Sequence, residues 1–465
     1  MALPPKLSIA CHCGAVNQTV RLREQSSSGP QEINLCHCTA CRHNTGLLCV
    51  SYAGIARPGS IEGLKEYHST TKTITRFFCA TCGCHVFWKL QSPLMDKSYS
   101  QVRDGAPAAA EHQEWWAVAT GVIIGAYGDG GDGGEESGDG YSEMVMRYAK
   151  HINTAGTRDG GLSPFIRGVE GLEVIGNQDQ PPPSSRQSAK EKLEGSGHGV
   201  DLEAFFRSYR KEGREEEVLK AFCHCRMVQF HITRPNAASK LPRSNFPDLM
   251  VPYHTGSPQI QNPDDHKWWL RPELSRRSRK AETLLAEEVQ LKRYLAGTCA
   301  CRSCRLTSGF EIQTWAFIPR ANIFFHIHES HKNSSTSGTW TPLSLKESNE
   351  AADIVPLDFA ALPPSILTSY ESSQGVRREF CSHCGATVFW RDRWRPELMD
   401  VSVGLLDAAE GARAETWLDW WTGRVSFAED AGNGRTGETA RRAKSLIGSL
   451  EDGMRRHDEQ RRKGS

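Results

Sequence analysis

The chain has 465 residues, of which 38% are apolar and 24% are charged. This composition is typical of a globular protein, and the length predicts two or three domains of about 150 residues each. The net charge is only +1, so the overall charge argues against a nucleic-acid partner. No apolar run approaches the roughly 18 to 20 residues that span a bilayer, and we therefore expect no membrane insertion.

Fourteen of the sixteen cysteines follow an order that occurs twice. Each half of the chain carries a C-x-C pair, then a C-x-C-x-x-C triad, then a C-x-x-C pair. In the first half these are Cys11, Cys13, Cys36, Cys38, Cys41, Cys79 and Cys82. In the second half they are Cys223, Cys225, Cys299, Cys301, Cys304, Cys381 and Cys384. Thiolates at such spacing can share one tetrahedral Zn²⁺ with a distant pair, so the repeat predicts two modules built on zinc.

Disulfides are the other common use of many cysteines, and they belong mainly to small secreted domains. The chain opens with MALPPKLSIA, which has no basic segment followed by an apolar segment and a cleavage site. We therefore expect a reducing compartment and no secretion. The cytoplasm fits best, and the nucleus is compatible as well.

The repeat also predicts the domain boundaries. We expect a first zinc domain at 1–175 with a disordered acidic, glycine-rich loop at 125–140, a linker at 176–200, a second zinc domain at 201–428 with an insertion at about 234–296, and a charged tail at 429–465. Apolar periodicity predicts helices at 201–221 and 272–296, and the tail reads as a frayed or surface helix.

The core of each module is predicted to be β. Short segments rich in valine, threonine and aromatic residues lie between turn residues, which is typical of strands. The segments are 15–22, 47–52, 74–78, 86–90, 228–233, 315–319 and 387–391. The expected fold class is therefore mainly β, with two tandem domains and a few peripheral helices.

Sets of four and of three thiols predict different chemistry. If the outer pairs of each half meet, they form a closed Cys₄ shell, which indicates structural zinc. The first shell would consist of Cys11, Cys13, Cys79 and Cys82, and the second of Cys223, Cys225, Cys381 and Cys384. The triads Cys36, Cys38, Cys41 and Cys299, Cys301, Cys304 leave a position for an exogenous thiol, which makes them the catalytic candidates. The alternative is a closed triad with a fourth ligand, for example His37 or His43. The matching positions of the second half are Ala300 and Leu306.

The other candidate residues have simpler interpretations. Cys49 and Cys84 have no repeat partner, and such cysteines are usually small buried apolar residues rather than reactive thiols. Phe87-Trp88 and Phe389-Trp390 could line a pocket beside a metal. Adjacent aromatic residues on a strand more often pack one side chain into the core and use the other as cover.

The segments CHCGAV, CHCTACRHNTG and FFCATCGCHVFW of the first half resemble the glutathione-dependent formaldehyde-activating family, which is also named for centromere protein V. The segments CHCRMV, CACRSCRLTSG and EFCSHCGATVFW of the second half, followed by MDVSVGLLD, resemble it again. Three features depart from the family pattern. Arg226 replaces the glycine after C-x-C, the second half carries a large insertion before its triad, and Cys84-His85 replaces the usual Thr-Pro after C-G.

The resemblance implies an Mss4-like zinc fold in both halves. It also implies one structural zinc on the outer four cysteines and a second zinc on the triad, near a glutathione site, which makes about two Zn²⁺ per domain. Family members are carbon-sulfur lyases or synthases of S-hydroxymethylglutathione. The expected activity is thus addition of a zinc-held glutathione thiolate to formaldehyde or a similar small electrophile.

Two other classes of function compete with this enzyme. One is a non-catalytic, zinc-stabilised binding or scaffold module, whose sequence sign would be a long basic or proline-rich arm. The other is thiol redox chemistry at Cys49 or Cys84, which requires an unligated cysteine of low pKa. The sequence does not identify the substrate, a general acid or base, or the oligomeric state.

Overall fold

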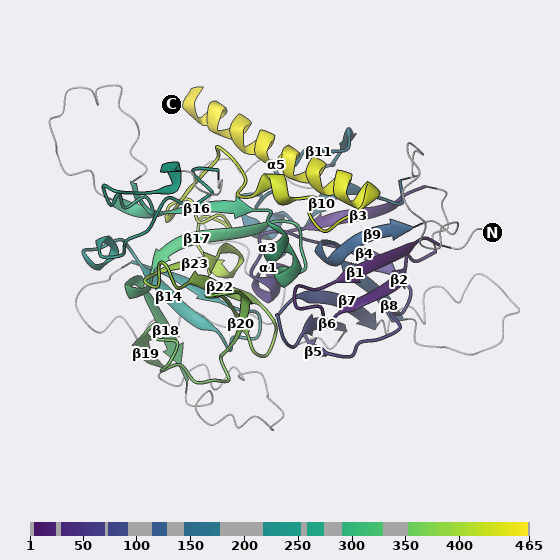
Figure 1. The fold of residues 1–465 in the computed structure, drawn as a ribbon, viewed down its shortest axis with the longest axis horizontal. Helices are drawn as coiled ribbons and strands as arrows, with labels where there is room; N and C mark the ends of the chain where they lie inside the picture. Colours follow the sequence, from purple (N-terminus) through teal and green to yellow (C-terminus); the bar gives the residue numbers. More distant parts are fainter. Residues whose placement is uncertain are drawn as a thin grey trace, which may run out of the picture.

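The computed structural model describes residues 4–24, 29–69, 73–91, 114–127, 144–176, 217–252, 258–273, 291–328 and 352–463. Over these ranges the protein is mainly β, as the sequence predicts, with three α-helices (Figure 1). None of the described helices has the length and apolar character needed to cross a membrane. Residues 177–200 of the expected linker and 128–140 of the expected loop lie outside the described residues, and residues 125–127, where the loop was expected to begin, belong to a strand instead.

The first half of the chain forms its own sheets. Its strands are β1 (Lys6–Ala10), β2 (Asn17–Arg21), β3 (Gln31–Cys36), β4 (Val50–Ile55), β5 (Leu64–His68), β6 (Ile74–Cys79), β7 (His85–Gln91), β8 (Glu114–Ala119), β9 (Ile123–Tyr127), β10 (Met146–Ile152), β11 (Gly168–Val169) and β12 (Leu172–Glu173). They pair as β2-β1-β9, as β10-β3-β4-β8-β7-β6-β5 and as β11-β12. The helix α1 (Thr39–Thr45) carries the end of the first triad.

The second half repeats this plan with its own strands. These are β13 (Val218–Phe222), β14 (Gln229–Thr233), β15 (Leu270–Pro272), β16 (Leu291–Cys299), β17 (Gln313–Pro319), β18 (Ile323–Ile327), β19 (Asp353–Pro356), β20 (Leu367–Ser373), β21 (Val376–Cys381), β22 (Thr387–Asp392), β23 (Leu398–Ser402), β24 (Leu406–Asp407) and β25 (Leu418–Trp420). They pair as β19-β18-β14-β13-β24 and as β15-β16-β17-β23-β22-β21-β20, with β25 on β16. The helix α3 (Arg302–Ser308) is the counterpart of α1.

Local irregularities repeat along with the strands. The hairpin β6–β7 shifts register between Phe77 and Phe78, and the hairpin β21–β22 shifts between Glu379 and Phe380. Each shift lies directly before a C-x-x-C pair. A bulge of this kind bends the strand locally, so the same device directs the late cysteines of both halves.

Glycines make the close contact between the two halves. The amide of Gly121 donates to the carbonyl of Gly309 at 2.9 Å, and the amide of Gly404 donates to the carbonyl of Gly46 at 3.0 Å. Gly46 and Gly309 end the helices α1 and α3 in the left-handed conformation. A Cβ on Gly121 would lie 2.5 Å from the amide nitrogen of Phe310, so only glycine permits this approach. The halves therefore meet through matched backbone contacts.

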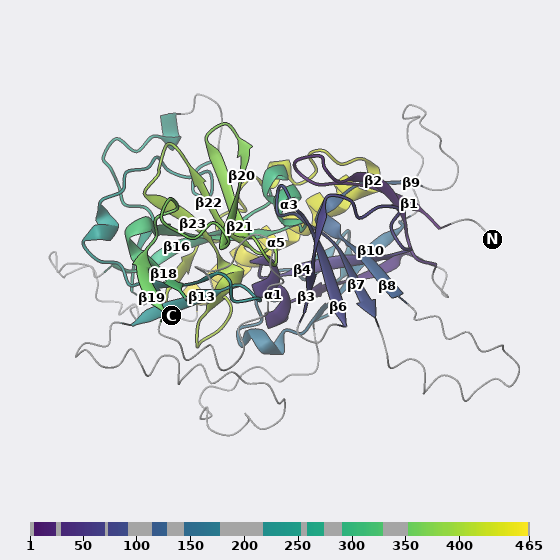
Figure 2. The ribbon, with the colours of Figure 1, turned by 90° about the horizontal axis from the view of Figure 1, so that it is seen from below.

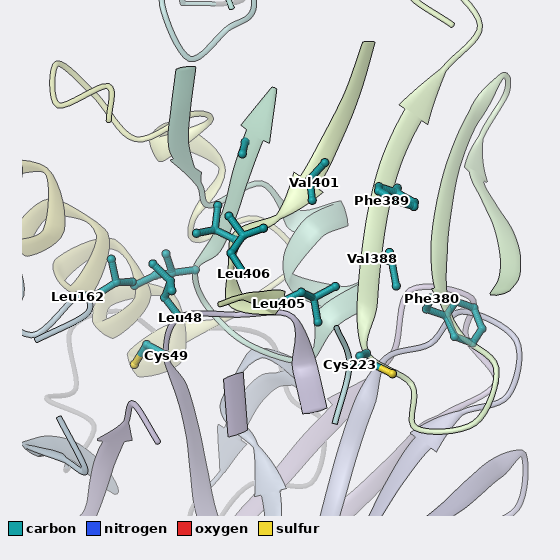
Figure 3. Close-up of a cluster of buried hydrophobic side chains, with 14 of the residues drawn as sticks. Leu48, Cys49, Leu162, Cys223, Phe380, Val388, Phe389, Val401, Leu405 and Leu406 are labelled. Atoms are coloured by element: carbon teal, nitrogen blue, oxygen red, sulfur yellow. The ribbon is translucent and has the colours of Figure 1, made fainter. Parts of the chain in front are cut away.

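The hydrophobic core continues across this contact. A single cluster of buried side chains includes Leu48 and Leu162 from the first half together with Leu405 and Leu406 from the second. Figure 3 shows these side chains beside one another. The two halves thus share apolar surface and are expected to unfold together.

The helix α5 (Gly437–Lys463) lies across the top of the molecule in Figure 1. It contacts β9 and β11 of the first half, and its Glu451 side chain accepts a hydrogen bond from the Val425 amide of the second half. Leu446, Ile447 and Leu450 are buried. The prediction of a helix is confirmed, but the expectation that it is frayed or lies on the surface is wrong, because one apolar face joins the core.

Two of the predicted helices are contradicted where the structure describes them. Residues 218–222 and 291–299 are the strands β13 and β16, although the periodicity of 201–221 and 272–296 favours helix. Both strands lie in the interior of sheets. Most of β16 is buried, β13 buries Leu219 and Ala221 in alternation, and sheet pairing overrides a helical pattern of apolar residues there. The remaining parts, 201–216 and 274–290, lie outside the described residues.

We predict that Gly121→Ala lowers the free energy of unfolding by about 1–3 kcal/mol, because the new methyl group meets backbone atoms of the other half. Denaturant unfolding followed by fluorescence measures this change. Gly59→Ala is the matched control, since a Cβ there meets nothing within 4 Å. Equal stability of the two variants would contradict the tight contact.

Candidate metal centres

The structure brings the outer cysteines of the first half together. Cys11, Cys13, Cys79 and Cys82 have sulfur atoms that all lie within 4.8 Å of one another. The Sγ of Cys13 is 3.5 Å from those of Cys11 and Cys79. Four sulfurs around one Zn²⁺ lie about 3.8 Å apart when each bond is about 2.3 Å, so this donor set fits a tetrahedral zinc. A disulfide would require about 2.05 Å.

The outer cysteines of the second half form the same arrangement. Cys223, Cys225, Cys381 and Cys384 cluster within the same limit. The Sγ of Cys225 is 3.4 Å from that of Cys223 and 3.5 Å from that of Cys381. All four side chains are buried. Four buried thiolates without a cation would repel one another, so this set also fits zinc.

The turn after the C-x-C pair is left-handed in both halves. Gly14 has φ +80°, and Arg226 at the matching position has φ +65°. A non-glycine residue in this region costs of order 1 kcal/mol. The guanidinium carbon of Arg226 lies 3.3 Å from the centre of the Phe222 ring, and this stacking offsets the strain. The departure from glycine therefore leaves the cysteine cluster intact.

The triads form separate, smaller clusters. Cys36, Cys38 and Cys41 lie within 4.8 Å of one another, and so do Cys299, Cys301 and Cys304. The second cysteine of each triad caps a helix, because the Sγ of Cys38 accepts the amide of Cys41 at 3.3 Å and the Sγ of Cys301 accepts that of Cys304 at 3.2 Å. Among the described residues, no histidine or carboxylate joins either cluster.

The proposed fourth ligands of the first triad point elsewhere. His37 Nε2 is 2.9 Å from Nδ1 of His151 in a buried pair. His43 Nδ1 is 2.7 Å from the carbonyl oxygen of Phe222, and the two rings stack. Neither His37 nor His43 therefore joins the cysteine cluster of the first triad in this structure.

A buried arginine contacts each triad, and the sequence analysis did not identify it. Arg76 donates to the Sγ of Cys41 at 3.4 Å, and Arg378 donates to the Sγ of Cys304 at 3.4 Å. Hydrogen bonds from the other two triad cysteines, and then the arginine charge, lower the pKa of Cys41 and of Cys304. The sequence repeat could have identified both arginines, because each lies three residues before the first cysteine of C-x-x-C in its own half.

A cavity of about 110 Å³ adjoins the second triad. All three triad cysteines line it, and so does Arg378. Aromatic side chains form part of the wall, namely Trp315, Phe317, Trp390 and Phe427. Trp390 belongs to one of the aromatic pairs noted in the sequence, and its partner Phe389 is fully buried. Trp390 thus lines the pocket beside the triad, and Phe389 packs into the core.

Carboxyl groups form another part of this wall. Asp400 pairs with Arg395, whose Nη1 lies 2.8 Å from Oδ1, and Asp248 accepts a hydrogen bond from the Ser426 hydroxyl. Burial raises the pKa of both Asp248 and Asp400 to about 6, against the lowering effect of these partners. Asp248 comes from the expected insertion at 234–296. The insertion therefore supplies part of the cavity wall.

The first triad has different neighbours at the matching positions. Tyr52 stands where the second half has Trp315, and its hydroxyl accepts from Arg76 at 3.2 Å. Asn153 stands where the second half has Phe427, and both have positive φ. The side-chain amide of Asn153 donates to the Sγ of Cys36 at 3.4 Å. At these two positions the first triad thus has a phenol hydroxyl and an amide, whereas the second triad has an indole ring and a phenyl ring.

Cys49 and Cys84 belong to none of the four cysteine clusters. Both are buried, with 5% and 0% of their surface exposed. Burial raises the pKa of both thiols. A buried thiol of raised pKa is a poor nucleophile, which supports the interpretation as small apolar residues and argues against redox chemistry.

Parts of both halves are similar to one known protein family. The family model described as glutathione-dependent formaldehyde-activating enzyme matches residues 6–117 and 361–424. The first range holds all seven repeated cysteines of the first half, and the second range holds Cys381 and Cys384. No curated protein and no solved structure matched the chain.

We predict that Asp248→Asn makes the stability of the protein less dependent on pH. In the wild type, the pKa of Asp248 is about 6 in the folded state and about 4 in the unfolded state, so the folded state holds this proton more tightly. The resulting stabilisation is complete below about pH 4 and is lost as the pH rises through about 6. The free energy of unfolding of the variant relative to the wild type should therefore rise by about 1 kcal/mol between pH 5 and pH 8. Denaturant titrations of the metal-loaded proteins test this, and parallel pH profiles would contradict it.

Proposed function

Because residues 6–117 and 361–424 are regions of the glutathione-dependent formaldehyde-activating type, we propose that this protein is a zinc-dependent carbon-sulfur lyase that resembles S-(hydroxymethyl)glutathione synthase. Its two halves act as tandem zinc domains. The observation that carries the proposal is a cluster of three thiols, with a buried arginine, beside a cavity. Glutathione is the co-substrate, and formaldehyde or a similar small carbonyl compound is the electrophile.

The outer four-cysteine sets have a structural role in this proposal. A shell of four thiolates leaves no coordination position for a substrate. Each set joins segments that are far apart in sequence, so a bound zinc would stabilise the fold by of order 10 kcal/mol. The protein works in a reducing compartment, cytoplasmic or nuclear, because its cysteines must stay reduced to bind metal.

The triads would hold a second zinc in each half through their three sulfur atoms. When bound there, zinc would leave one coordination position for the glutathione sulfur and would keep that sulfur deprotonated. Arg378 and Arg76 would offset the negative charge that three thiolates accumulate. The second triad is the stronger catalytic candidate, because the described cavity adjoins it.

The cavity residues account for the rest of the chemistry. The glutathione sulfur adds to the carbonyl carbon, a carbon-sulfur bond forms, and the electron pair of the carbonyl π bond moves to oxygen. A protonated Asp248 or Asp400 can give that oxygen its proton, since the raised pKa leaves a protonated fraction near neutral pH. The reverse elimination returns the proton and breaks the carbon-sulfur bond.

The size of the cavity limits the substrate. A cavity of about 110 Å³ holds a small carbonyl compound but not a whole tripeptide. Most of a bound glutathione would therefore lie outside it, with the sulfur at the mouth. The aromatic wall, which includes Trp315 and Phe427, would exclude water from the reacting carbon.

We predict that the purified protein contains about four zinc ions per chain, one for each cysteine cluster. Cys301→Ser should lose about one zinc and weaken glutathione binding at least tenfold, because it removes one of three sulfurs at the second triad. Metal analysis and calorimetric titration with glutathione measure both effects. Cys49→Ser is the control, and it should keep all four zinc ions because Cys49 lies outside the clusters.

Two outcomes would count against this function. Unchanged zinc content and glutathione affinity in Cys301→Ser would remove the triad as the site. A wild-type protein that holds four zinc ions but binds no glutathione would favour the non-catalytic scaffold. Cys36→Ser separates the two halves, since it should lose a zinc ion while glutathione still binds at the second triad.

A further inference from the structure

One histidine of the first half reaches the second triad. His12 lies between the outer cysteines Cys11 and Cys13, and its side chain crosses to the second half of the chain. His12 Nε2 is 3.1 Å from the hydroxyl of Ser303, and Nδ1 is 2.8 Å from the hydroxyl of Tyr370. Ser303 lies inside the triad segment, directly before Cys304. Figures 1 and 2 both place α3, which carries Ser303, where the two halves meet.

The contact continues to the sulfur of the second triad. Arg378 donates from Nη2 to the hydroxyl of Ser303 at 3.0 Å and from Nη1 to the Sγ of Cys304 at 3.4 Å. Since Ser303 accepts from Arg378, its own hydrogen is free to point at His12 Nε2. A continuous chain of hydrogen bonds therefore runs from His12 through Ser303 and Arg378 to Cys304.

Backbone bonds fix the beginning of this chain. The amide of His12 donates to the carbonyl of Leu306 on α3 at 3.1 Å. His12 is flanked on both sides by cysteines of the outer cluster, so a filled cluster would hold its backbone in place. The imidazole is thus placed by the first half, while its partners belong to the second half.

The matching contact from the second half to the first triad lacks one link of this hydrogen-bond chain. His224, at the matching position of the second half, donates its amide to the carbonyl of His43 at 2.8 Å and has Nδ1 at 2.6 Å from the hydroxyl of Tyr67. The residue that corresponds to Ser303 is Ala40, which has no hydroxyl. Arg76 uses a guanidinium nitrogen for Tyr52 instead. Among the described residues, only the second triad is linked to the opposite outer cluster in this way.

We propose that His12 and Ser303 are positioning residues for the second triad, so that the outer cluster of the first half supports the metal and thiol chemistry of the second half. The proposal rests on the proposed function, since it assigns that chemistry to the second triad. His12 fixes Ser303, Ser303 fixes the guanidinium of Arg378, and Arg378 sets the charge and orientation of the Cys304 sulfur. The second triad would therefore depend on the first half of the same chain for the orientation of its arginine.

The effect on metal binding should be measurable. Groups that orient metal ligands typically contribute 10- to 100-fold to metal affinity. Without the Ser303 hydroxyl, Nη2 of the buried guanidinium loses its partner, and the Nε bond to the Ser372 hydroxyl at 3.2 Å is left to orient the arm that faces Cys304. We therefore expect the affinity of the second triad to fall about tenfold or more in Ser303→Ala and in His12→Phe.

The test uses full-length protein loaded with Co²⁺, whose absorption bands report thiolate ligands. A Cys41→Ser background leaves the second triad as the one intact three-thiol cluster among the described residues. Ser303→Ala and His12→Phe should each shift the cobalt bands of this cluster and weaken it in competition with a chelator. The two changes combined should cost no more than either alone, because they interrupt the same chain.

Two controls separate positioning from a general loss of structure. Ser303→Thr keeps the hydroxyl and should restore the wild-type spectrum. His224→Phe removes the matching histidine and should leave the second triad unchanged. Wild-type bands and affinity in both Ser303→Ala and His12→Phe would overturn the proposal, as would an equal change in His224→Phe.

This readout is independent of glutathione. If the unsubstituted protein binds no glutathione while Ser303→Ala still shifts the cobalt bands, the positioning role stands and the proposed enzyme does not. If glutathione binds with the same affinity to all variants and the bands do not move, the enzyme stands and the positioning role is overturned.

Discussion

The convergence of cysteine sulfurs is the constraint on which the rest of this structure depends. Each outer set draws two hairpin regions, about 65 to 160 residues apart in sequence, into contact. Thiolates at such short range repel one another unless a cation lies between them, so the same geometry that fits zinc would be strained without it. The strands, the bulges before C-x-x-C and the left-handed turns after C-x-C all serve to direct these sulfurs.

The sequence predicted those features that depend on residues close together in the chain. Ligand spacing within C-x-C and C-x-x-C sets which thiols lie near each other, and the repeat predicts that two such sets exist. The segments 74–78 and 387–391, which were predicted as strands from their β-branched and aromatic residues, lie in the strands β6 and β22. Where two residues meet only through the fold, as Arg378 and Cys304 do, a single sequence carries no direct signal.

The errors have physical causes. Residues 291–296 were predicted to end a helix because leucines recur among charged residues, but they belong to β16, which pairs with β15, β17 and β25 inside a sheet. The tail reads as a surface helix because it is rich in arginine, yet its buried leucines lie on one side of the helix. The contact between the halves depends on glycines such as Gly121 and Gly404, whose role appears only when the opposing backbone is in place.

The two halves are alike in architecture and unlike in chemistry. The second half adds Asp248 from its insertion, has Trp315 in place of Tyr52 and Phe427 in place of Asn153, and the described cavity lies there. The most direct test of the account is X-ray absorption at the zinc edge of the purified protein. We expect about 3.5 sulfur neighbours per zinc at about 2.3 Å, rising toward four when glutathione is added. Four sulfurs per zinc before glutathione, with no change afterwards, would contradict the three-thiol site.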